Sequence, residues 1–190
     1  MRYWRFRYLL GRATTFRLVI GAAGIYEKGW LPTEVEFLDL LCPATWDRYF
    51  APDSVDAMLA EHVWEHLTPE DGLKAAQTCY RYLRTGGYLR IAVPDGLNPD
   101  PNYIDAVRIA GSGPGADDHK VLYTYQTFGQ LFEKAGFNVH LLEYFDEQGR
   151  FHMIDWQPEQ GLISRSKRYD PRNADGQVRY TSIVLDAYKH

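Results

Sequence analysis

RLVIGAAG, residues 17–24, joins a short apolar run to a turn that is rich in glycine. The apolar run predicts a buried strand, and the glycines that follow it predict a tight turn. Because glycine carries no Cβ, such a turn allows a ligand to approach the bare backbone. The stretch therefore predicts the first strand of an α/β fold, with a ligand site at the carboxyl end of that strand.

Strands and helices are predicted to alternate along the rest of the chain. Apolar runs predict further strands at residues 36–41, 55–60, 88–93, 137–142 and 180–187. The clearest helix begins at Pro69 with Thr68 as its N-cap, and Gly86-Gly87 is predicted to end it. A second helix is predicted at 125–135. This alternation predicts a Rossmann-like sheet, mostly parallel with an antiparallel C-terminal hairpin.

Length and composition suit a single domain over residues 1–190. The chain has 190 residues, of which 45% are hydrophobic, and this is enough for one sizeable core. Residues 1–15 are predicted to be a capping segment, 94–123 a lid or rim loop, and 146–176 an insertion on the substrate side. A loop as long as 94–123 inside a compact domain is more often functional than filler.

Charge and cysteine content exclude some classes of function. The formal net charge is −4, so we expect no nucleic-acid partner, which usually requires a basic face. Two cysteines, Cys42 and Cys79, are too few for a disulfide framework and favour a reducing, cytoplasmic setting. No run approaches the ~20 apolar residues of a membrane span.

Three stretches, in this order, resemble the class I S-adenosylmethionine (SAM)-dependent methyltransferases. They are LVIGAAG at 18–24, AMLAEHVWEHL at 57–67 and LRTGGYLRIAVP at 83–94. The nearest match is the small "type 11" group of predicted methyltransferases, and the resemblance covers residues 17 to about 137. The glycine turn alone is weak evidence, but the ordered series is fairly specific.

The resemblance implies SAM as the cofactor and a set of residues to hold it. It places the amino-acid end of SAM on the turn formed by Gly21, Ala22, Ala23 and Gly24, with Glu61 and His62 at the end of a later strand. A carboxylate after the second strand accepts the ribose hydroxyls in this family. Glu34 and Asp39 compete for that role; we favour Glu34 at the ribose and Asp39 with Leu40 beside the adenine. The short spacing predicts a shortened first helix, with 25–30 as loop.

Two departures from the family pattern leave other functions open. Val19 stands where the family usually has an acidic residue, and Ala23 stands where it usually has a glycine. An alanine methyl narrows the approach to the ligand, so the alternative is a catalytically inactive module that binds SAM or a partner on the same fold. A nicotinamide-dependent oxidoreductase is less favoured, because the turn lacks the full G-x-G-x-x-G fingerprint.

The string His62-Val63-Trp64-Glu65-His66 also spells H-x-x-E-H, a zinc-protease motif. Both histidines would hold zinc from one helical face, and Glu65 would act as general base. The string directly follows a predicted strand, however, and Thr68-Pro69 begins a new helix. No third ligand stands nearby in the sequence. We therefore predict that the string is metal-free.

The methyl group of SAM is carried by a cationic sulfonium, so alignment with the acceptor is the main task of the protein. A base is needed only where the acceptor must lose a proton. His119, in the loop 94–123, is the first candidate, with Asp117 or Asp118 beside it as an orienting group. His152 is the second candidate. The alternative for His119 is an exposed loop histidine.

The late polar stretch contains candidates for binding a small-molecule acceptor. Arg165, Arg168 and Arg172 crowd this stretch and are suited to a phosphate or a carboxylate. The alternative is a solvated, salt-bridged surface loop. Phe151 and Trp156 would suit a homodimer contact, and they would equally suit burial.

Overall fold

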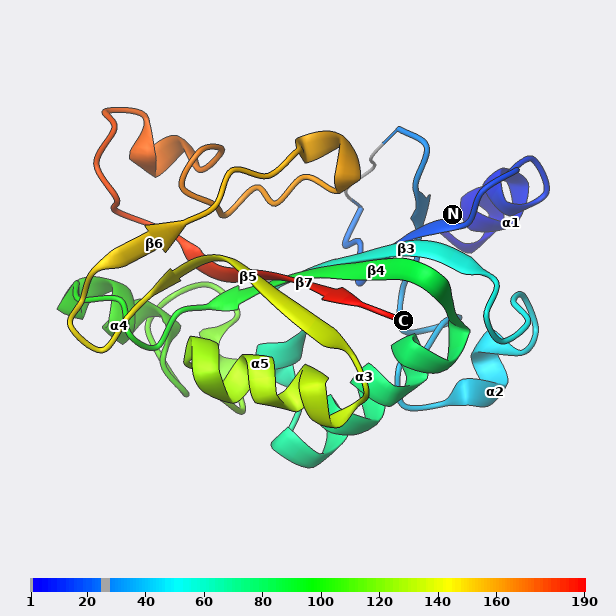
Figure 1. The fold of residues 1–190 in the computed structure, drawn as a ribbon, viewed down its shortest axis with the longest axis horizontal. Coiled ribbons are helices and arrows are strands. Elements are labelled where there is room, and N and C mark those ends of the chain that lie inside the picture. The colour runs from blue at the N-terminus through cyan, green and yellow to red at the C-terminus, as the bar shows by residue number, and fades with distance from the viewer. Residues whose placement is uncertain (1, 25–27) are drawn as a thin grey trace.

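The computed structural model describes residues 2–24 and 28–190, and its centre is one seven-stranded sheet (Figure 1). The strand order is β2-β1-β3-β4-β7-β5-β6. β1 to β5 run in one direction, while β7, inserted between β4 and β5, and the edge strand β6 run against them. The predicted mostly parallel α/β sheet is confirmed. The strands are β1 (Arg17–Ile20), β2 (Leu31–Pro32), β3 (Val55–Glu61), β4 (Leu83–Pro94), β5 (Asn138–Phe145), β6 (Phe151–Met153) and β7 (Ser182–Tyr188).

Helices cover one face of the sheet, and an irregular segment covers the other. α3 and α5 pack below the sheet in Figure 1, whereas the chain between β6 and β7 lies above it. No helix in the described ranges is long and apolar enough to cross a membrane. The helices are α1 (Arg2–Leu10), α2 (Pro43–Trp46), α3 (Pro69–Tyr82), α4 (Pro101–Val107) and α5 (Tyr125–Lys134).

α3 begins as the sequence predicts and ends earlier than predicted. The Thr68 side chain accepts a hydrogen bond from the backbone N–H of Asp71, which caps the helix. The helix ends at Tyr82, because Leu83 adopts an extended conformation and pairs with Val55 of β3. The prediction that Gly86-Gly87 ends this helix is therefore wrong: both glycines lie inside β4.

The predicted strand at 36–41 is also wrong. This stretch forms turns that lead into α2, and the second strand is the short β2. Phe37, Leu38 and Leu40 are buried in the core, so their apolar pattern reflects side-chain packing rather than strand pairing. Residues 25–27, part of the predicted loop 25–30, lie outside the described residues.

The segment 94–123 was predicted as a loop, but it contains α4 and a 3-10 turn at Ala116–Asp118. The Asp100 side chain caps α4 by accepting from the N–H of Asn102, and Pro101 occupies its first position. The N-terminal segment 1–15 likewise contains a helix, α1, whose Phe6 is fully buried in the core.

A buried ion pair attaches the segment between β6 and β7 to the sheet. Arg90 of β4 is 1% exposed and makes two 2.8 Å hydrogen bonds to Asp186 of β7. Its remaining nitrogen donates to the carbonyls of Gln157 and Gly161, at 2.9 and 3.0 Å. Trp156 packs in the same layer and is 5% exposed, so it serves burial within one chain.

Candidate cofactor and acceptor site

The glycine-rich turn after β1 is held by Thr33, the residue that follows the neighbouring strand β2. Thr33 N–H donates to the carbonyl of Val19 at 2.8 Å, and Ala22 N–H donates to the carbonyl of Thr33 at 2.9 Å. Gly21 has φ +60°, and a Cβ there would lie 3.0 Å from Val63 Cγ2. Ala23 has φ +48°, a left-handed conformation that glycine adopts more readily.

The two carboxylates that competed for the ribose role occupy different places. Glu34 directly follows the Thr33 that bonds to the turn, and its side chain is 12% exposed in an ion pair with Arg2 at 3.3 Å. Asp39 instead accepts a hydrogen bond from Leu41 N–H, in the turns before α2. Leu40 is 7% exposed and packs in the core. The geometry places Glu34, rather than Asp39, beside the turn.

A cavity of about 60 Å³ lies against the turn, with Ile20, Gly21 and Leu59 among its walls. Its outer wall comes from the segment between β6 and β7, including Leu162 and Ser164. Glu61, at the end of β3, holds this segment by accepting from the N–H groups of Ser164 and Arg165, at 3.0 and 2.7 Å. The cofactor candidates Gly21, Ala22 and Glu61 therefore line one cavity.

A second cavity, of about 240 Å³, opens at the carboxyl ends of β3 and β4. Candidates far apart in the sequence line it together: His62, His119, Arg165 and Arg172. Tyr180, which the sequence did not single out, is also in the wall, and the Arg172 guanidinium lies 3.3 Å from the centre of its ring. No local pattern in the sequence marks Tyr180.

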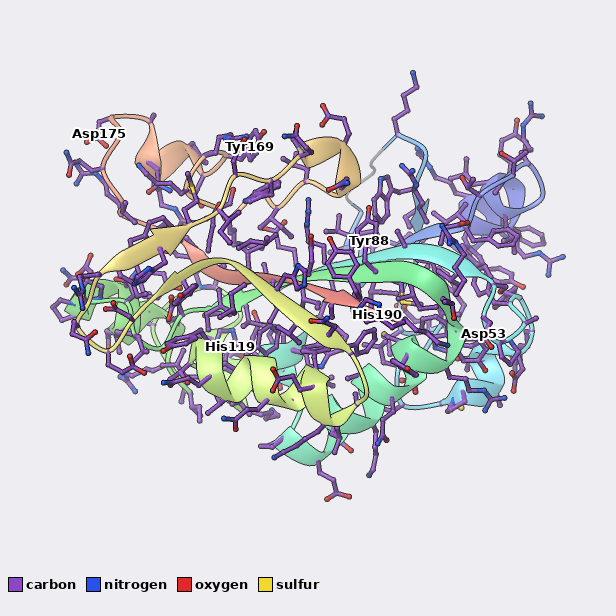
Figure 2. The ribbon with its side chains drawn as sticks, in the orientation of Figure 1. Asp53, Tyr88, His119, Tyr169, Asp175 and His190 are labelled. Atoms are coloured by element: carbon purple, nitrogen blue, oxygen red, sulfur yellow. The ribbon has the colours of Figure 1, made fainter. Side chains whose placement is uncertain are left out.

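His119 is buried, not an exposed loop residue, and it lies on the opposite side of the sheet from Tyr169 (Figure 2). Its Nδ1 is 2.7 Å from the carbonyl of Val107. A carbonyl only accepts, so Nδ1 carries the proton and Nε2 keeps a lone pair. Asp118 does not orient this ring; it bonds to Lys120 at 2.5 Å.

Two further candidates lie away from this cavity. His152 is on β6, where Nε2 is 2.8 Å from Asp146 and the ring stacks on Tyr144. This contact lowers the pKa of Asp146 to about 2. Arg168 donates to Asp155 and to the carbonyl of Trp156. Neither side chain is in the cavity wall that His119 and Arg172 share.

The residues beside the turn fit the chemistry of SAM. The turn offers backbone free of large side chains, and Glu34 offers oxygens that accept hydrogen bonds from hydroxyl groups. The present cavity is smaller than the about 300–1,000 Å³ typical of ligand pockets. Leu162 and Ser164 form part of its wall, so in this conformation the segment that carries them leaves less room than a molecule of that size needs.

Comparison with known proteins supports the same assignment. A family model described as methyltransferase domain matches residues 31–91. The match covers roughly a third of the chain. It agrees with the resemblance to the class I SAM-dependent methyltransferases and supports SAM as the cofactor. None of the curated proteins matches the sequence significantly.

Several solved structures share the fold at low sequence identity. A SAM-dependent methyltransferase from Archaeoglobus fulgidus is 15% identical, with a TM-score of 0.50, and the match covers 98% of this chain and 90% of that one. A Thermotoga maritima protein, described as a SAM-dependent methyltransferase and "possible histamine N-methyltransferase", is 14% identical, with a TM-score of 0.51 and coverage of 99% and 89%. PigF, solved with S-adenosylhomocysteine, is 12% identical, with a TM-score of 0.51 and coverage of 93% and 50%.

Proposed function

We propose that this chain transfers the methyl group of SAM to a small acceptor that carries a carboxylate or a phosphate. The observation that carries the proposal is the adjacency of the two cavities. Glu61 lines the cavity at the glycine turn, and the next residue, His62, lines the larger one. Arg165 lines the larger cavity and lies 3.5 Å from Glu61. Direct methyl transfer requires the sulfonium methyl and the acceptor atom to approach within about 3–3.5 Å, so the donor and acceptor sites must adjoin.

The charges in the larger cavity support an anionic acceptor. Arg165 and Arg172 both line it, and a guanidinium pairs with carboxylate or phosphate through two parallel hydrogen bonds. Asp170 holds the Arg172 guanidinium through two hydrogen bonds of 2.8 and 2.7 Å. That contact fixes the orientation of the Arg172 guanidinium, while the Arg165 guanidinium lies 3.5 Å from the Glu61 carboxylate.

SAM supplies an electrophilic methyl group on a sulfonium. The protein has three tasks: to exclude water, to orient the acceptor and to accept a proton where the acceptor must lose one. Leu162 and Ser164, in the wall of the cavity at the turn, would exclude water from it, and Arg165 with Arg172 would orient the acceptor. His119 is placed to take the proton of an acceptor that must lose one, since the Nε2 lone pair remains free when Nδ1 donates to Val107. Cys42 and Cys79 are free thiols, in keeping with a reducing, cytoplasmic setting.

The first test is cofactor binding, measured by isothermal titration of SAM and S-adenosylhomocysteine. We expect one site, weakened at least tenfold by Gly21→Val, because the new Cβ would meet Val63 at a positive φ. Gly176→Val is the matched control: Gly176 has φ +84° and nothing within 4 Å of its Cβ position. Absence of binding at millimolar ligand would contradict the proposal.

The second test is turnover with a panel of small carboxylates and phosphate esters, followed by release of S-adenosylhomocysteine. Once an acceptor is found, His119→Ala should lower turnover at least tenfold and leave SAM affinity nearly unchanged, since loss of a general base typically costs about 10²–10⁴ in rate. Unchanged turnover in this variant would remove His119 from the reaction.

A second candidate function is a SAM-binding or partner-binding module without turnover. The observation that favours it is the turn itself, where Ala23 takes a left-handed conformation beside a cavity of only about 60 Å³. SAM binding without methyl transfer to any member of the acceptor panel would favour this function over the enzyme.

A further inference from the structure

Below, the cavity at the glycine-rich turn is called the cofactor cavity, and the larger one, lined by Arg165 and Arg172, the acceptor cavity. Three side chains outside the cofactor cavity converge beside the acceptor cavity: Glu65, His66 and His119. One ligand atom from each lies within 4.8 Å of the others. The rings of His66 and His119 meet edge to face, with centres 5.0 Å apart. We propose that Glu65, His66 and His119 bind one divalent transition-metal ion of the type of Zn²⁺ or Mn²⁺.

The Glu65 carboxylate is the strongest reason for a cation. The residue is fully buried, and among the described residues neither of its oxygens has a hydrogen-bond partner. His62 Nδ1 lies 3.0 Å from Oε1 without hydrogen-bond geometry. A buried carboxylate that lacks hydrogen bonds is costly, and a bound cation is one of the few groups that compensate it.

The two histidines have nitrogens available for a metal. His119 uses Nδ1 on the Val107 carbonyl, so Nε2 keeps its lone pair. Metal-binding histidines commonly donate their second nitrogen to a backbone carbonyl in this way, which fixes the ring. His66 Nδ1 is buried and, within the described chain, makes no hydrogen bond. Asp118 lies 3.4 Å from it.

The backbone holds these residues together. Glu65 and His66 belong to the 3-10 turn Trp64–His66, whose Trp64 is fully buried. Lys120 N–H donates to the carbonyl of Glu65 at 2.7 Å, which fixes the residue after His119 against this turn. The three ligands therefore come from two backbone segments that are bonded directly to each other.

The ligand set indicates the class of ion. Two imidazoles and one carboxylate suit Zn²⁺, Mn²⁺ or Fe²⁺, whereas Mg²⁺ and Ca²⁺ prefer sites built from oxygen. Metal–ligand bonds of about 2.0–2.2 Å place ligand atoms roughly 3–4 Å apart. The present separation of up to 4.8 Å thus requires small side-chain rotations that close the site around the ion.

This arrangement differs from the zinc-protease motif that H-x-x-E-H spells. His62 is not one of the three clustered residues. Its Nε2 is 2.9 Å from the Ser182 hydroxyl, and its Nδ1 lies 3.0 Å from Glu65. The sequence predicted a metal-free string for lack of a third ligand, and the fold supplies that ligand as His119. His119 also lines the acceptor cavity, so a bound ion would face the acceptor. Nε2 would then be a metal ligand, and the role of base proposed above applies to the protein without the ion.

Metal binding does not depend on the proposed methyl transfer and is tested separately. Protein without a histidine tag is stripped with a chelator and titrated with ZnCl₂ or MnCl₂ by calorimetry. Elemental analysis gives the stoichiometry, and the visible absorption of added Co²⁺ gives the ligand geometry. We expect one ion per chain, and at least tenfold weaker binding in His66→Ala, His119→Ala and Glu65→Gln.

Two histidine variants serve as matched controls. His140→Ala removes an exposed ring on β5, and His62→Gln removes the first histidine of the string; both should keep the ion. His119→Gln retains most of the side-chain volume, so it replaces His119→Ala if the alanine variant fails to fold. Circular dichroism without metal checks the fold of every variant.

Three results would overturn the proposal. One is the absence of binding by Zn²⁺, Mn²⁺ or Co²⁺ at millimolar concentration. Another is full affinity in folded variants of both His66 and His119. The last is loss of the ion in His62→Gln with retention in His119→Gln, which would assign the ion to the H-x-x-E-H string instead.

Discussion

Ala23, the third residue of the glycine-rich turn, combines local strain with a departure from the family pattern. Its φ of +48° is a left-handed conformation that costs an L-residue about 1–2 kcal/mol. From the family pattern we also expect its methyl group to narrow the approach of SAM to the turn, although Ala23 is not among the residues that line the cavity there. Both effects come from one side chain, so one substitution tests them together.

We expect Ala23→Gly to raise stability by about 0.5 kcal/mol, because relief of strain exceeds the entropy that glycine adds to the unfolded chain. It should also tighten SAM binding, as measured by calorimetry beside urea denaturation. Ala110, at φ +53°, is the control: Ala110→Gly should raise stability and leave SAM binding unchanged. Equal SAM affinity in wild type and Ala23→Gly would show that the methyl group does not limit binding.

At the scale of elements, the segment between β6 and β7 takes the place of helices on one face of the sheet. Polar side chains from the strands, rather than its own secondary structure, fix this segment. The Arg90 guanidinium donates hydrogen bonds to the carbonyls of Gln157 and Gly161. The Glu61 carboxylate accepts hydrogen bonds from the N–H groups of Ser164 and Arg165. The cover of the cofactor cavity therefore depends on two charged side chains of the sheet, the buried Arg90 and the partly buried Glu61.

Arg90→Met should destabilise the protein by about 3–5 kcal/mol in urea denaturation, because Asp186 is left buried without its partner. Hydrogen exchange at 157–165 should also become faster. Arg84→Met is the control on the same strand, since the Arg84–Asp56 pair is half exposed and contributes only about 0–1 kcal/mol. Similar losses in both variants would show that burial of the Arg90 pair is not what stabilises this face.

Across the whole molecule, Asp95 connects three elements at the end of β4. Its carboxylate accepts from the N–H of Phe145 in β5 and of Leu97, while its own N–H donates to the hydroxyl of Tyr103 in α4. Burial raises the pKa of Asp95 from 3.8 to about 6, and the hydrogen bonds from Phe145 and Leu97 oppose the shift. The ionised form of Asp95 is thus disfavoured in the folded state.

This shift predicts how stability depends on pH. Between pH 4 and 6 the unfolded chain releases the Asp95 proton while the folded chain retains it, so the Asp95 contribution to stability falls as pH rises through this range. The fall amounts to at most about 3 kcal/mol. Urea denaturation from pH 4 to 7 should show it as a slope difference between wild type and Asp95→Asn. Parallel pH profiles in the two proteins would contradict the assignment.

Local patterns in the sequence predicted the elements whose signals are local. The apolar run before Gly21 predicted β1, Thr68-Pro69 predicted the start of α3, and the helical pattern after Thr124 predicted α5. The local pattern gave a wrong prediction where the structure of a segment depends on distant partners. Leu83 extends because Val55 pairs with it, and the apolar side chains of 36–41 are buried without joining a strand.

The sequence by itself determined the class of fold and the glycine-rich turn, because period, capping residues and ordered motifs are properties of neighbouring residues. Through the resemblance of those motifs it also predicted the cofactor. Only the tertiary structure decided which distant side chains meet. It brought His119 to Glu65 and His66, placed Arg165 and Arg172 in one wall and left Arg168 outside it. The physical reason is that strand pairing and burial fix such convergences through contacts between segments far apart in the chain, which no local pattern encodes.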